Sequence, residues 1–73
     1  MNLSELWVIA RRYGVVQLST NSDGTYHACI TFSTAKHTEL KVRSDWNHLH
    51  PEAALEKAIQ GAKEIVDDVK RIA

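Results

Sequence analysis

Four histidines and one cysteine are the side chains in this 73-residue chain best suited to metal binding or nucleophilic catalysis. His48 and His50 stand two residues apart, and the other candidate ligands are spread along the chain: Asp45, His27, Cys29 and His37. Imidazole and thiolate ligands suit zinc, which needs four ligands in a structural site. Because no second pair of ligands accompanies His48 and His50, we interpret them as polar residues of a connecting segment. We expect no metal and no cofactor.

A second chemical possibility is a nucleophile and base formed by Cys29 and His27, two residues apart on one predicted strand. Their side chains would share a face about 6–7 Å apart. A nucleophile needs its base within hydrogen-bond reach and a third group to orient that base, and the sequence indicates neither. No Gly-rich phosphate loop is present, since the glycines are scattered at Gly14, Gly24 and Gly61. We therefore expect that the chain is not an enzyme.

Length and composition predict a single domain over residues 1–73, near the lower size limit for folding without disulfides or metals. A single cysteine permits no internal disulfide and fits a cytoplasmic location. No apolar segment is long enough to span a bilayer, so we expect no membrane insertion. Nine basic residues balance nine acidic ones. This balance disfavours autonomous nucleic-acid binding but leaves direct contact with nucleic acid undecided.

The elements that must position these residues begin with a long helix predicted over residues 51–73. Pro51 suits the first helical turn, where its missing N–H has no cost. Apolar residues follow at helical spacing and form one stripe: Leu55, Ala58, Ile59, Ala62, Ile65, Val66, Val69 and Ile72. Such a stripe has to be covered by the residues that precede it.

A shorter helix is predicted near the N-terminus. Asn2 and Glu5 have the spacing of a capping box, and apolar residues recur at helical intervals: Leu3, Leu6, Trp7, Ala10 and Tyr13. Gly14 is placed to end the helix in a left-handed conformation. A strand through Leu6–Ala10 is the competing interpretation, because Trp7-Val8-Ile9 favours β-structure.

Three strands are predicted over residues 15–20, 25–33 and 38–43, with Asp23-Gly24 in the first hairpin turn. In the second strand alternate residues should face the core: Tyr26, Ala28, Ile30 and Phe32. In the connection before the long helix, Trp46 and Leu49 are expected to close one end of the core. The predicted class is α+β: a small two-layer α-β-β-β-α domain whose three-stranded antiparallel sheet packs against the C-terminal helix.

Six residues are candidates for binding a partner: Trp7, Arg11, Arg12, His27, Lys41 and Arg43. The four arginine and lysine side chains would steer an encounter, and Trp7 and His27 would anchor it. The basic residues form one patch only if the end of the first helix lies near the third strand. The alternatives are a solvated charged face and a Trp7 that belongs to the core.

The α-β-β-β-α order and the alanine-rich segment PEAALEKA (residues 51–58) resemble the double-stranded-RNA-binding domains. That family places lysines at the start of its last helix to bind phosphates, whereas this chain has His48, Leu49, His50, Pro51 and Glu52. The stretch from Asp23-Gly24-Thr25-Tyr26 to Ala62-Lys63-Glu64 is similar to antitoxins of the HicB type, without their Pro-Gly-Cys loop.

The opening segment MNLSELWVIARRYG (residues 1–14), together with the length of 73 residues, resembles the small transcription regulators of lytic Xanthomonas phages. This resemblance implies a protein that binds host bacterial RNA polymerase through its large subunits. It further implies that initiation is inhibited by weakened retention of the sigma factor, and that read-through of terminators is favoured.

Overall fold

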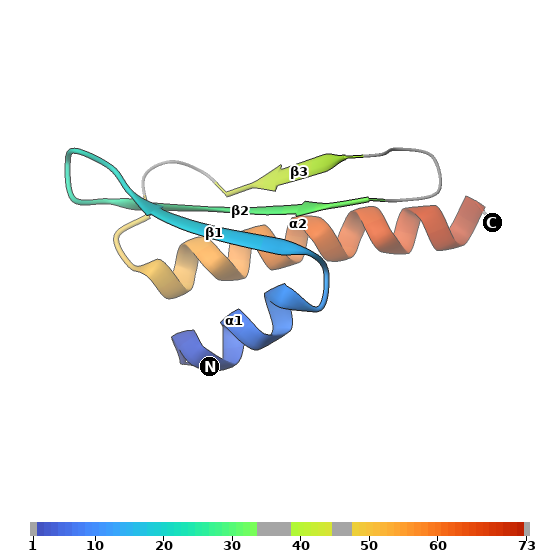
Figure 1. Cartoon of the computed structure of the whole chain (residues 1–73), viewed down its shortest axis with the longest axis horizontal. Helices are drawn as coiled ribbons and strands as arrows, with labels where there is room; N and C mark the ends of the chain where they lie inside the picture. The colour runs from blue at the N-terminus through green and yellow to red at the C-terminus, as the bar shows by residue number, and fades with distance from the viewer. Residues whose placement is uncertain (1, 34–38, 45–47, 73) are drawn as a thin grey trace.

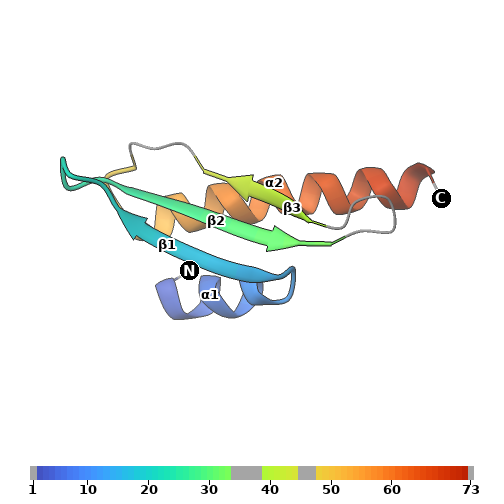
Figure 2. The ribbon, with the colours of Figure 1, turned by 45° about the horizontal axis from the view of Figure 1, so that its top comes forward.

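The five expected elements are present, in the order α-β-β-β-α (Figure 1). A computed structural model describes residues 2–33, 39–44 and 48–72, with backbone alone at 68–72. The elements are α1 (Leu3–Arg11), β1 (Val15–Thr20), β2 (Tyr26–Phe32), β3 (Leu40–Arg43) and α2 (Pro51–Ile72). The strands form one antiparallel sheet in the order β1-β2-β3, and both helices lie on the same face of it (Figure 2). The predicted fold class is confirmed.

The segment around Trp7 is helical, so the alternative strand through Leu6–Ala10 is wrong. The side chain of Asn2 caps α1, its Oδ1 accepting a hydrogen bond from the backbone N–H of Glu5 at 2.9 Å. Leu6 and Ala10 are buried and Trp7 is half-buried against the core. The last turn narrows to hydrogen bonds that span three residues instead of four. The Arg12 N–H donates to the Ile9 carbonyl, and the Tyr13 N–H donates to the Ala10 carbonyl.

Gly14 follows this turn, but it does not adopt the left-handed conformation that was expected to end the helix. Its φ is outside the left-handed region, and Gly24 at φ 85° is the glycine with a positive φ. A Cβ on Gly14 would lie 2.1 Å from the carbonyl oxygen of Thr31 and 2.9 Å from the Cβ of Phe32. The position therefore requires glycine because the chain crosses the end of β2 in close contact.

The hairpin joining β1 to β2 uses the predicted Asp-Gly turn. The Gly24 N–H donates to the Asn21 carbonyl at 3.0 Å, and the Asn21 N–H donates to the Thr25 carbonyl at 2.8 Å. Gly24 supplies the positive φ that a side chain would disfavour. The register beyond the turn is continuous, from Thr20 opposite Tyr26 to Val15 opposite Thr31.

The core lies between β2 and the first half of α2. Ile30 and Leu55 are the largest fully buried side chains, and α2 adds three small ones with no exposed surface: Ala54, Ala58 and Ala62. Alanines let the helix approach the sheet closely; a Cβ on Gly61 would lie 2.7 Å from Val42 Cγ1. The inward set predicted for β2 is confirmed by Ala28, Ile30 and Phe32, all buried, and by the half-buried Tyr26.

One expectation about the core is wrong. Leu49 is 76% exposed and does not close the end of the core. Trp46, its expected companion, lies outside the described residues. At that end of the sheet the main chain of His48 forms a bridge with Tyr26, through bonds of 2.8 and 3.3 Å.

Leu55→Ala should lower the free energy of unfolding by about 2–5 kcal/mol, because it leaves a cavity in the most buried part of the core. Ile59→Ala removes a half-buried side chain on the same helix and should cost about half as much. Urea denaturation followed by circular dichroism measures both. Equal losses would contradict the assignment of Leu55 to the centre of the core.

Gly14→Ala should destabilise the fold by about 1–3 kcal/mol, because the new methyl group displaces the backbone of β2 at Thr31. Gly24→Asn is the matched control. It alters a turn glycine with no neighbour within 4 Å of its Cβ position, and asparagine tolerates positive φ. A Gly14→Ala protein as stable as wild type would show that the close crossing of β2 is wrong.

Candidate functional site

The face of the sheet opposite the helices carries three of the six predicted binding residues. The strand register builds this open face in rows: Val15, Thr31 and Lys41 form one, and Gln17, Cys29 and Arg43 form the next. His27 lies in a third row beside Ser19. Lys41 and Arg43 are exposed and lie two residues apart on β3, so both charges stand on the same side of one edge strand.

The other three predicted residues lie in the helix layer. Arg11 and Arg12 are exposed at the C-terminal end of α1, and Trp7 is half-buried one turn earlier. Helix α1 packs against β1 and α2, whereas β3 is the opposite edge of the sheet (Figure 2). The structure therefore divides the six residues into two groups of three on different surfaces, and the single basic patch that required α1 to end near β3 is not formed.

His27 belongs to a polar network that rigidifies the β1–β2 turn. Its Nδ1 lies 2.8 Å from Asn21 Oδ1, and Asn21 Nδ2 donates to Thr25 Oγ1 at 2.9 Å. Thr25 is buried, and its hydroxyl and N–H donate to Asp23 Oδ1 at 2.6 and 3.0 Å. These two bonds, the side-chain one first, lower the pKa of Asp23 below its ordinary value of 3.8. The imidazole of His27 is thus held in place by the turn.

Cys29 faces the open side of the sheet and is nevertheless buried, with 8% of its surface exposed. It sits in the central strand between Gln17 and Arg43, whose longer side chains flank it. Its Sγ lies 4.0 Å from Thr31 Oγ1, at the limit for a hydrogen bond to sulfur, while His27 is bonded to the turn. This arrangement gives the thiol a packing role.

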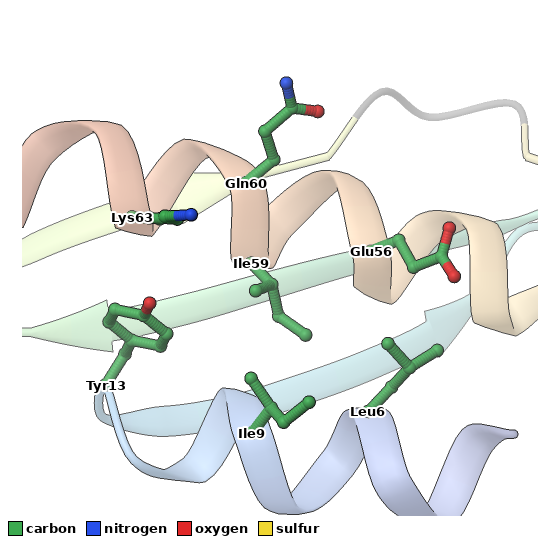
Figure 3. Close-up of a pocket in the computed structure, with 7 residues that line it drawn as sticks. All are labelled: Leu6, Ile9, Tyr13, Glu56, Ile59, Gln60 and Lys63. Carbon is green, nitrogen blue, oxygen red and sulfur yellow. The ribbon is translucent and has the colours of Figure 1, made fainter. Parts of the chain in front are cut away.

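A shallow groove of about 460 Å³ runs between α1 and α2 (Figure 3). Leu6 and Ile9 of α1 point toward Ile59 of α2, and polar side chains border them: Tyr13, Glu56, Gln60 and Lys63. The floor is apolar, and the charged rim carries one acid and one base. The groove is suited to an apolar contact.

His48 and His50, in the connection before α2, differ in how far they are buried. His50 is exposed, whereas His48 is half-buried, and its Nε2 is buried without a hydrogen-bond partner among the described residues. No group of three or more histidine, cysteine, aspartate or glutamate side chains gathers in the described part of the chain. The other two candidate ligands, His37 and Asp45, lie outside it.

Sequence reasoning missed Ser44, which ends the pairing of β2 with β3. Ser44 is 4% exposed; its Oγ accepts a bond from the Ala28 N–H at 2.8 Å, and its own N–H donates to the Ala28 carbonyl at 2.9 Å. A serine after an alternating strand is an ordinary turn signal. Its burial depends on Ala28, 16 residues earlier, and therefore could not be predicted from the neighbouring residues.

Asp23→Ala should destabilise the protein at neutral pH, because the Thr25 hydroxyl and N–H lose their acceptor. The folded pKa is the lower one, so the contribution of this carboxylate is present above pH 3.8 and is lost as the pH falls through the folded value. Chemical denaturation between pH 7 and pH 2 should show the two proteins converging below pH 3.8. Ser22→Ala, an exposed change in the same turn, is the control and should show no such convergence.

Comparison of the chain with protein-family models, with curated proteins and with solved structures finds no match in any of the three. Neither α1 nor the described part of α2 is both long and apolar enough to cross a bilayer.

Proposed function

We propose that this chain is a non-enzymatic transcription regulator of a lytic phage, which binds the RNA polymerase of its host in the bacterial cytoplasm. It contacts the large polymerase subunits and weakens the retention of the sigma factor, which inhibits initiation. It also favours read-through of terminators. The partner and these two effects come from the resemblance of residues 1–14 to small phage regulators of this kind.

The observation that carries the proposal is the open face of the sheet. Both helices pack on the other side of the sheet (Figure 1). Lys41 and Arg43 are exposed on the open side. Their partners across the sheet, Thr31 and Cys29, are uncharged, and His27 is hydrogen-bonded within the turn network. A sheet face with the hydrogen-bonded His27 and two cations at one edge suits a protein surface that carries acidic residues.

Double-stranded-RNA binding is the second candidate, because both helices lie on one face of a three-stranded sheet in the order that family shows. The start of α2 argues against it. Glu52 lies in the first turn, and the first lysine is Lys57, nearly two turns in. A carboxylate at this end repels phosphates, which an RNA-binding domain has to attract.

Reversing the open-face charges with Lys41→Glu and Arg43→Glu should weaken binding to purified bacterial RNA polymerase about tenfold at low salt, because rim charges steer association. The loss should shrink at high salt as the charges are screened. Release of sigma factor from the polymerase, measured on the same samples, should fall in parallel. Surface plasmon resonance across a salt series gives the binding constants.

Lys57→Glu with Lys63→Glu is the matched control, since it makes the same change in net charge at two exposed residues of the helix layer. If this control weakens binding as much as the open-face variant does, or if the open-face variant binds normally, the assigned face is wrong. A duplex-RNA titration separates the second candidate: useful affinity near physiological salt, with a steep salt dependence, would favour it.

A further inference from the structure

The two edges of the sheet differ in how they are protected. Edge strand β3 has four residues, of which Lys41 and Arg43 are charged. Strand β1 has six residues, VVQLST, with no charge and no proline, and its register with β2 is continuous. Short length, charge, proline and bulges are the devices that keep sheet edges from pairing. The β1 edge has none of them and is therefore competent to accept another strand.

Helix α1 supplies a floor beneath that edge. Successive helical residues are 100° apart, so Trp7 lies about 160° around the axis from Ile9, which lines the groove toward α2. Leu3 and Trp7 accordingly lie on the flank of α1 that faces away from α2. On that side of the helix layer the sheet ends at β1 (Figure 2). A hollow of about 290 Å³ bordered by Leu3, Ser4 and Trp7 lies there. We call these three residues the α1 shelf.

A second copy of the chain does not fit this edge. Paired strands lie about 4.8 Å apart, and α1 packs against β1 in the helix layer. Pairing of β1 with β1 of another copy would therefore bring the two α1 helices within about 5 Å, whereas packed helices need 8–10 Å. A segment with no helix beneath it avoids this clash. The occupant that fits is a single extended peptide.

The positive charge of Arg11, next to the β1 edge, indicates which residue type is favoured at one end of that peptide. Arg11 follows Trp7 by one helical turn and lies on the same flank, near the start of β1, because residues 12–14 join the two elements. Arg12 lies a further 100° around the helix, away from the shelf. A strand antiparallel to β1 would end near Arg11, so an acidic residue at its C-terminal end is complementary.

We propose that the β1 edge binds an extended peptide of a partner protein by strand addition. Apolar side chains at alternate positions of the peptide pack on the α1 shelf, polar ones face the open side, and an acidic residue at the C-terminal end meets Arg11. Backbone hydrogen bonds supply affinity in such complexes, and alternate side chains supply specificity. This surface is separate from the open face, and the inference holds whether or not the partner is RNA polymerase.

The probe is a synthetic eight-residue peptide with blocked ends, in which valine and threonine alternate and aspartate is the last residue. Titrated into the full ¹⁵N-labelled chain, it should shift the amide resonances of Val15 to Thr20 and the indole resonance of Trp7. N-methylation of the peptide amides along one edge should abolish binding, and along the other edge should leave it intact. Moving the aspartate to the first position should weaken binding.

Two variants test the assigned end of the peptide. Arg11→Glu should weaken binding of the aspartate peptide about fivefold at low salt, while Arg12→Glu, with the same change in charge, should weaken it less than about twofold. Both residues are exposed, and circular dichroism verifies that the variants fold. Equal effects of the two variants would refute the assigned position of the acidic residue.

Three further results would overturn the inference itself. They are the absence of shifts in β1 with millimolar peptide, shifts confined to other elements, and equal sensitivity to N-methylation along either edge. A concentration-dependent dimer with protected β1 amides would show that a second copy occupies the edge. Because no polymerase is used, these results are independent of the charge-reversal test on the open face.

Discussion

The rest of the structure depends on the contact between the alanine face of α2 and strand β2. Ala54, Ala58 and Ala62 have no exposed surface, so the helix axis lies close to the sheet, and Leu55 and Ile30 fill the space beside them. Alanine loses no side-chain entropy on burial, which keeps the cost of ordering this contact low. In a chain of 73 residues the remaining core is too small to replace it. The placement of α1 and of both edge strands follows from this contact.

With α2 lying along β2 and β3, the remaining half of the helix layer is filled by α1, which packs beneath β1. This arrangement leaves two surfaces of different character. The open face has the hydrogen-bonded His27 and two cations, whereas the β1 edge has unprotected backbone groups above the α1 shelf. The first suits recognition through side chains and the second recognition through the main chain. The two surfaces lie on different sides of the domain, so a ligand on one does not block the other.

Local patterns predicted the elements well, because each depends on neighbouring residues. The bounds of β1, the Asn2 cap, the Asp23-Gly24 turn and the alternation in β2 are all legible over a few positions. What could not be predicted depends on contacts between distant segments: the crossing of β2 that requires Gly14, the buried Ser44, and the separation of Arg11 from Arg43 by the width of the sheet. The sequence therefore supplied the six candidate residues, but it did not predict that they would lie on two different surfaces.

The open face also separates the positions that maintain the fold from those that can vary. Ser19 and Lys41 are exposed and lie outside the core, so exchanging their side chains should leave the backbone beneath them unchanged. A protein that must follow a changing binding partner can accept substitutions here one at a time, each without loss of stability. Gly14 has the opposite property, since any other residue there would separate β1 from β2. Selection for new specificity can therefore act on one side of the sheet while selection for folding acts on the other.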